Sequence, residues 1–75
     1  MAQLPTLNGN EVRKAFEKFG WEFSRQSGSH MVPTKDGEMA SLSVPKHREV
    51  AKGTLRGLIR AANLTIDEFI DASWS

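Results

Sequence analysis

The sequence predicts a small α+β domain in which helices cover one face of a three-stranded antiparallel sheet. Three observations lead to this prediction. Apolar residues recur at helical spacing near both ends of the chain, the middle alternates apolar and polar residues, and short turn motifs separate the alternating runs. The predicted order is α-β-β-β-α-α, which gives so few elements one shared core. With 75 residues, there is room for a single domain over residues 1–75.

The first helix is predicted from four apolar residues at i, i+3, i+4 and i+7, which are Val12, Ala15, Phe16 and Phe19. Charged side chains occupy the opposite side of this helix. Asn8 or Asn10 is suited to cap its start, and Gly20 follows the last periodic residue, where helices commonly end.

Three strands are predicted after this helix. Residues 21–25 alternate apolar and polar positions, as a half-buried strand does. A turn at residues 27–29 leads to a second strand, residues 30–32. Pro33 is expected to end that strand, because proline cannot donate a hydrogen bond to the ladder.

The third strand is predicted over residues 39–44. It follows an Asp-Gly turn within residues 35–38, which is a strong hairpin signal. Its alternation places three apolar residues on one face, which are Ala40, Leu42 and Val44. Pro45 is expected to end it.

Two helices are predicted to complete the chain. Thr54 is expected to open the first, whose apolar face is formed by Leu55, Leu58, Ile59 and Ala62. Thr65 and Glu68 have the spacing of a capping box. They should begin a short last helix that buries Ile66, Phe69 and Ile70.

The composition excludes several classes of protein. A hydrophobic share of 39% and a charged share of 25% indicate a globular chain. The absence of cysteine removes disulfides, thiolate-bound zinc and thiol nucleophiles. Residues 1–5 show no signal peptide, and no apolar run approaches the ~20 residues of a membrane span, so no membrane association is expected.

Positive charge is concentrated between residues 45 and 60, where Glu49 is the only acidic residue. The basic residues of this block are Lys46, Arg48, Lys52, Arg56 and Arg60. All the charged residues within residues 61–75 are acidic. This distribution suggests one surface that attracts anions, although charge alone favours the alternative, a solvated basic helix face.

The segment 25–30 holds the first candidate site. His30 follows a glycine turn at the start of a strand, and imidazole is the side chain best suited to proton transfer near neutral pH. Gln26 and Ser29 could orient it or bind a phosphate oxygen, and Arg25 could neutralise charge. An ordinary surface histidine is the alternative.

A second candidate site combines Lys46 and His47 with the start of the following helix. Lys52 precedes Gly53 and Thr54, whose backbone N–H groups would lie at the positive end of the helix dipole. A plain helix cap is the alternative. The two histidines are far apart in sequence and no cysteine is present, so no metal site is expected.

Together these motifs resemble the HicA family of mRNA interferase toxins. The resemblance runs from Val12 to about Ile70. It rests on Gly20-Trp21, the run Arg25-Gln26-Ser27-Gly28-Ser29-His30, Val44-Pro45-Lys46-His47, Lys52-Gly53-Thr54-Leu55, and Asp67-Glu68-Phe69.

The resemblance implies a fold similar to a double-stranded RNA-binding domain and a cytoplasmic endoribonuclease of bacteria or archaea. Such a toxin cleaves mRNA and slows translation until a HicB-like antitoxin covers its active site, and no cofactor is expected. It implies a monomer when free and a hetero-oligomer with the antitoxin. The catalytic histidine of the family corresponds to His30. Many members carry a second histidine or another polar residue next to it, where this chain has Met31.

These residues permit, as a hypothesis, a mechanism that needs no metal. His30 would take the proton of a ribose 2′-OH, while Lys46, Lys52 or nearby backbone amides stabilise the developing charge, and His47 is the only other imidazole available as an acid. The residues expected to contact RNA are Arg25, Gln26, Ser29, Lys46, His47, Lys52, Thr54, Arg56 and Arg60. The alternatives are a non-catalytic RNA-binding module and a protein-interaction domain whose basic face binds an acidic partner.

Overall fold

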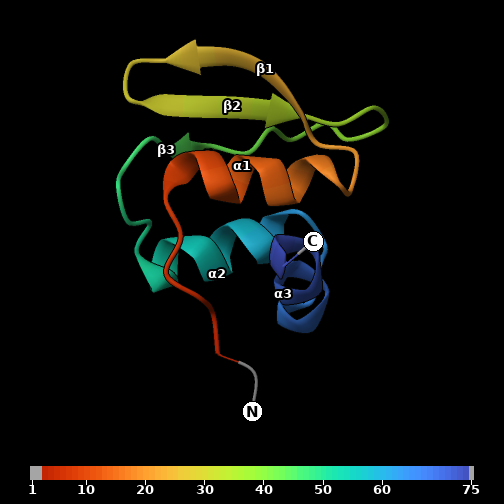
Figure 1. Cartoon of the computed structure of the whole chain (residues 1–75). Coiled ribbons are helices and arrows are strands. Elements are labelled where there is room, and N and C mark those ends of the chain that lie inside the picture. The colour runs from red at the N-terminus through yellow and green to blue at the C-terminus, as the bar shows by residue number, and fades with distance from the viewer. Residues whose placement is uncertain (1–2, 75) are drawn as a thin grey trace.

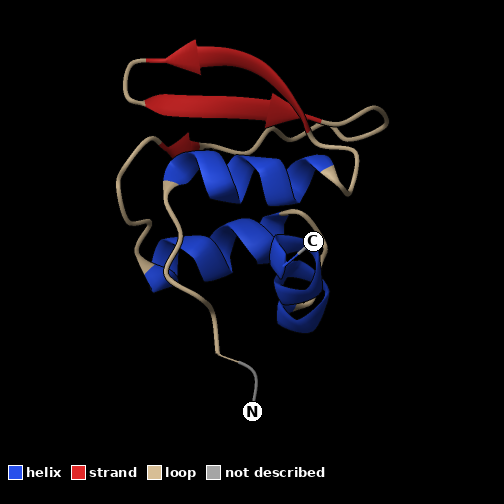
Figure 2. Ribbon diagram, viewed as in Figure 1, coloured by secondary structure: helices blue, strands red, loops and turns tan. Residues whose placement is uncertain are grey.

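The computed structural model of the chain describes residues 3–74 and has the predicted α+β architecture (Figures 1 and 2). Its elements are α1 (Gly9–Glu17), β1 (Glu22–Ser27), β2 (His30–Thr34), β3 (Val44–Pro45), α2 (Lys52–Ala61) and α3 (Ile66–Trp74). The strands form one antiparallel sheet in the order β1-β2-β3. Helix α1 packs on the sheet, and α3 packs on α1 and α2. The predicted order α-β-β-β-α-α is confirmed.

Capping boxes begin both α1 and α3. The Asn8 side chain accepts a hydrogen bond from the Glu11 N–H at 2.8 Å, and the Glu11 carboxylate accepts one from the Asn8 N–H at 2.9 Å. In α3, Thr65 Oγ1 accepts from the Glu68 N–H at 3.1 Å, and the Glu68 carboxylate accepts from the Thr65 N–H at 2.9 Å. Both boxes satisfy N–H groups that the first helical turn leaves unpaired. The predicted cap of α3 is confirmed, and Asn8, not Asn10, caps α1.

Helix α1 ends with two hydrogen bonds of a Schellman motif. The Gly20 N–H donates to the Glu17 carbonyl at 3.0 Å, and the Trp21 N–H donates to the Phe16 carbonyl at 3.2 Å. Gly20 has a φ of 93°. The predicted stop at this glycine is confirmed, but Phe19 lies beyond the last helical residue.

Helix α2 begins two residues earlier than predicted, at Lys52. Its N-cap residue is Ala51, which forms no side-chain cap hydrogen bond. Thr54 therefore lies within the first turn and does not open the helix. The predicted apolar face is confirmed, because Leu55, Leu58, Ile59 and Ala62 are all buried.

The core lies between the sheet and the helices. Its largest fully buried side chains include Trp21, Phe16, Phe69, Leu42 and Leu55. The rings of Phe16 and Phe69 have centroids 5.0 Å apart and are tilted by 51°, which is a favourable aromatic arrangement. This contact joins α1 to α3. Ile66 and Ile70 are only partly buried, whereas Phe69 is fully buried as predicted.

The predicted half-buried alternation of the first strand is wrong. All six residues of β1 are exposed, and the buried Trp21 lies just before the strand. Phe23 is 46% exposed and lies against the Arg13 guanidinium, whose central carbon is 5.7 Å from the ring centroid. The strand lies at the sheet edge and carries a bulge between Phe23 and Arg25, a common feature of edges.

The second and third strands also differ from the prediction, and Pro33 explains both differences. It does not end β2, because its carbonyl still accepts a hydrogen bond from the Leu42 N–H at 3.1 Å. Proline has no N–H to return to Leu42, so the ladder between β2 and β3 stops at the pair Met31–Val44. The third strand therefore shrinks from residues 39–44 to Val44–Pro45, and Ala40 is exposed.

The expectation of no signal peptide concerns partly Met1 and Ala2, which lie outside the described residues, as does Ser75. Within residues 3–74, no helix combines the length and the hydropathy needed to cross a membrane.

Candidate functional site

His30 is the first residue of β2 and is fixed by strand pairing on both sides. It lies opposite Ser27 of β1 and opposite Pro45 of β3. Gly28 precedes it in a two-residue turn with a φ of 60°, which is what the first central position of a type II′ hairpin turn requires. The side chain of His30 is partly exposed. The sheet thus holds the imidazole where solvent can reach it.

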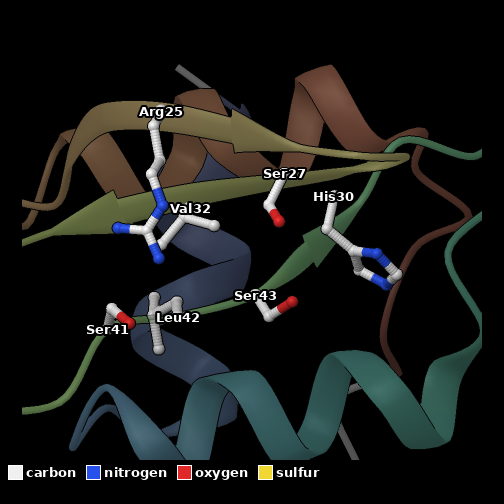
Figure 3. Close-up of a pocket in the computed structure, with 7 residues that line it drawn as sticks. All are labelled: Arg25, Ser27, His30, Val32, Ser41, Leu42 and Ser43. Atoms are coloured by element: carbon white, nitrogen blue, oxygen red, sulfur yellow. The ribbon is translucent and has the colours of Figure 1, made fainter.

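His30 and Arg25 project from the same face of the sheet. Arg25 lies opposite Val32, and residues directly opposite each other in an antiparallel pair share a face. Met31 belongs to the core, so its neighbours His30 and Val32 point away from the helices. Figure 3 shows this face, with α1 behind the strands.

These side chains line an open pocket of about 270 Å³, called here the histidine pocket. Its lining residues are Arg25, Ser27, His30, Val32, Ser41, Leu42 and Ser43. In Figure 3 the Arg25 guanidinium and the His30 imidazole lie toward opposite ends, and the hydroxyls of Ser27 and Ser43 lie between them. None of the described lining residues is acidic. A cation, hydroxyl donors and an imidazole can together hold an anion and move a proton.

The three serines of the histidine pocket were not expected from the sequence. Ser27 could have been found, because the alternation that carries Arg25 on one face of β1 carries Ser27 with it. Ser41 and Ser43 carry no comparable signal. They enter the pocket from the irregular segment before β3, whose path the sequence does not specify.

Gln26, near the end of β1, and Ser29, in the turn, do not line the histidine pocket. Gln26 lies opposite Met31, so it projects from the other face of the sheet. Its Nε2 donates to the Gly28 carbonyl at 3.1 Å. Ser29 is exposed, and its carbonyl accepts a hydrogen bond from the N–H of Lys46 at 2.7 Å.

The segment between β3 and α2 is held at three points. The backbone hydrogen bonds run from the Lys46 N–H to the Ser29 carbonyl at 2.7 Å, from the Gly9 N–H to the His47 carbonyl at 2.9 Å, and from the Val50 N–H to the Leu7 carbonyl at 2.8 Å. They place Lys46 beside the turn that precedes His30. Lys46 and His47 themselves line a second hollow of about 240 Å³ at the start of α1. The two histidines thus occupy different hollows, and within residues 3–74 no three potential ligands gather to hold a metal ion.

The basic residues of α2 fall into two groups. Lys52 and Thr54 are exposed in the first turn, where no side chain caps the helix. Arg56 and Arg60 line a third hollow of about 360 Å³ between the end of α2 and the start of α3, called here the arginine hollow. Its other lining residues are Ile59, Asn63, Leu64, Thr65 and Ile66. The two arginines and the histidine pocket thus share no hollow, and we leave Arg56 and Arg60 out of the proposed RNA surface.

The chain matches a known protein family over most of the residues that line the histidine pocket and the arginine hollow. The family described as "HicA toxin of bacterial toxin-antitoxin" matches residues 9–64 of the 75-residue chain. The chain belongs to the HicA toxin family. Its matched part runs from the start of α1 to Leu64, in the connection between α2 and α3, and includes the whole sheet. No curated protein sequence matches the chain.

Membership of the HicA family makes this chain the toxin of a toxin–antitoxin pair, and it implies a cognate antitoxin as partner. Both the histidine pocket and the arginine hollow lie largely within the matched residues. Both are open hollows at the surface, so a ligand bound in either one stays partly exposed to solvent.

Proposed function

We propose that this HicA toxin is an endoribonuclease that cleaves mRNA through His30 and thereby inhibits translation. The observation that carries the proposal is the histidine pocket, in which an accessible imidazole and a guanidinium share an open face of the sheet. Membership of the HicA family supports the assignment of the chain as a toxin. The histidine pocket provides side chains of the kind that phosphodiester cleavage needs.

In the proposed reaction the RNA supplies its own nucleophile. His30 takes the proton of a ribose 2′-OH, and the oxygen attacks the adjacent phosphorus. The O2′–P bond forms while the P–O5′ bond breaks, and the 5′-oxygen takes up a proton from water. The hydroxide left behind then takes the proton from His30, which restores the neutral imidazole. The products are a 2′,3′-cyclic phosphate and a 5′-hydroxyl. General base catalysis of this kind contributes about 10²–10⁴-fold.

Arg25 is the proposed partner of the phosphate. Its planar guanidinium can donate two hydrogen bonds to phosphate oxygens, and it lies in the pocket of His30. The hydroxyls of Ser27 and Ser43 lie between the two groups and can donate to the same oxygens. Loss of one donor to developing oxyanion charge typically costs about 10²–10³-fold in rate.

Residues outside the pocket extend the proposed RNA surface. Lys46 lies beside the turn that precedes His30, and Lys52 and Thr54 lie in the uncapped first turn of α2. These groups would bind phosphates on either side of the scissile one. His47 lies in a different hollow, so we assign it no role in proton transfer.

The test compares cleavage of a labelled single-stranded RNA by the parent chain, His30→Ala and His47→Ala, all in excess EDTA. We expect His30→Ala to lose at least about 10²-fold in rate while still binding RNA. His47→Ala is the matched control, since it removes the other imidazole and should cut within a few-fold of the parent. A substrate with 2′-deoxyribose at the cleaved position should resist the parent.

Other results would reject the proposal. An equal loss of cleavage rate in His30→Ala and His47→Ala would show that cleavage does not depend on the histidine pocket in particular. Cleavage of the 2′-deoxy substrate at the normal rate would remove the 2′-OH as nucleophile. RNA binding without cleavage by any variant, parent included, would favour a non-catalytic RNA-binding module.

A further inference from the structure

The arginine hollow is a surface outside the histidine pocket at which charged and apolar residues meet. Four of its lining residues matter here: Arg56 and Arg60 are exposed, whereas Leu64 and Ile66 are partly buried. Within residues 3–74 neither arginine forms an ion pair. The hollow thus combines two guanidinium groups without carboxylate partners and an apolar surface that is incompletely covered.

The walls of the hollow are fixed by the chain itself. At the end of α2 the Asn63 N–H donates to the Arg60 carbonyl and the Leu64 N–H donates to the Ile59 carbonyl, each at 3.0 Å. These are the two bonds of a Schellman motif, with Asn63 left-handed at a φ of 62°. Thr65 then caps α3 immediately. A partner that binds here meets a preformed site and has less chain to order.

We propose that the arginine hollow is a docking site for the antitoxin. The segment that it takes is acidic, with carboxylates paired to Arg56 and Arg60 and with an aliphatic or aromatic side chain covering Leu64 and Ile66. Guanidinium groups pair with carboxylates through two parallel hydrogen bonds, and an apolar anchor inside a polar rim is typical of protein interfaces. The proposal rests on membership of the toxin family, not on RNA cleavage.

The lining of the hollow favours a protein segment over RNA. An RNA strand offers phosphates but no aliphatic side chain to cover Leu64 and Ile66, and proteins commonly hold unpaired bases on aromatic rings. None of the described residues that line the hollow is aromatic. The hollow also shares no lining residue with the histidine pocket. In Figure 1 the end of α2 meets α3 on the right, whereas β2, which begins at His30, starts on the left.

The test measures two properties of each variant: the affinity for the purified cognate antitoxin, and the rate of RNA cleavage by the free toxin. We expect Arg56→Glu and Arg60→Glu each to weaken the complex by at least about tenfold, because a like charge then faces the acidic segment. Cleavage should stay within about threefold of the parent. The matched control is Lys14→Glu, which reverses an exposed charge on α1 and should change neither property.

Each outcome decides the proposal. Unchanged affinity of both arginine variants for the antitoxin would overturn it. Loss of RNA cleavage in parallel with loss of the complex would also overturn it, because the hollow would then serve RNA. If the parent chain fails to cut RNA, the proposed function fails, while binding of the antitoxin to the variants still tests the docking site.

Discussion

Gly9 is the residue at which the first helix touches the segment that follows β3. A Cβ built on it would lie 2.3 Å from the Pro45 carbonyl oxygen, well inside any normal contact. Its N–H also donates to the His47 carbonyl at 2.9 Å. This one position therefore joins the start of α1 to the segment that carries Lys46, beside the turn of the histidine pocket.

We expect Gly9→Ala to lower the free energy of unfolding by about 1–3 kcal/mol, because backbone must move to admit the methyl group. Urea denaturation monitored by tryptophan fluorescence measures the loss. Gly57→Ala is the matched control. Gly57 lies inside α2 with open space around its Cα, so alanine should raise stability by about 0.5–1 kcal/mol. Equal changes in the two variants would contradict the role of the Gly9 contact.

The sequence allowed the position of a site residue to be predicted where that position depends on neighbouring residues in the chain. The sequence placed His30 after a turn and grouped it with Arg25, and both line the histidine pocket. It grouped Gln26 with them as well, but the pairing register turns that side chain to the other face. Gly9 escaped notice because its role depends on Pro45, which is remote in sequence.

Among the features of the helices and strands, helix ends were predicted best from the sequence, because a helix cap needs only a few consecutive residues. The box formed by Thr65 and Glu68 was predicted and is present, and the glycine stop of α1 is present too. Strands were specified less well. The length of β3 depends on Pro33 across the sheet, since the missing N–H on one strand ends the ladder on another.

The caps give a prediction at the scale of an element. We expect Thr65→Ala to lower the free energy of unfolding by about 1 kcal/mol, because the Glu68 N–H loses its acceptor. Thr54→Ala is the control, since Thr54 lies inside the first turn of α2 and makes no cap hydrogen bond. Its effect should stay below about 0.5 kcal/mol. Thermal unfolding of the two variants under identical conditions measures the difference, and a larger loss in Thr54→Ala would contradict it.

At the scale of the whole molecule, the positive charge of residues 45–60 is divided between two surfaces. Arg56 and Arg60 line the arginine hollow, whereas Lys46 lies near the histidine pocket and Lys52 begins α2. Neither Arg56 nor Arg60 forms an ion pair within residues 3–74. The sequence predicted one basic surface, because spacing along a helix does not show which other elements pack beside each residue.

This division predicts how RNA binding depends on salt. If phosphates contact Arg25, Lys46 and Lys52 but not the arginine hollow, about three counterions are released, and the log–log slope for single-stranded RNA is about −2. Contacts from Arg56 and Arg60 in addition would steepen it to about −3.5. Titrations of the non-cleaving His30→Ala chain against salt measure the slope. Adding Lys46→Gln should then make it shallower by about 0.7, whereas adding Arg60→Gln should leave it unchanged. A slope near −3.5 that both changes reduce equally would show that RNA crosses both surfaces.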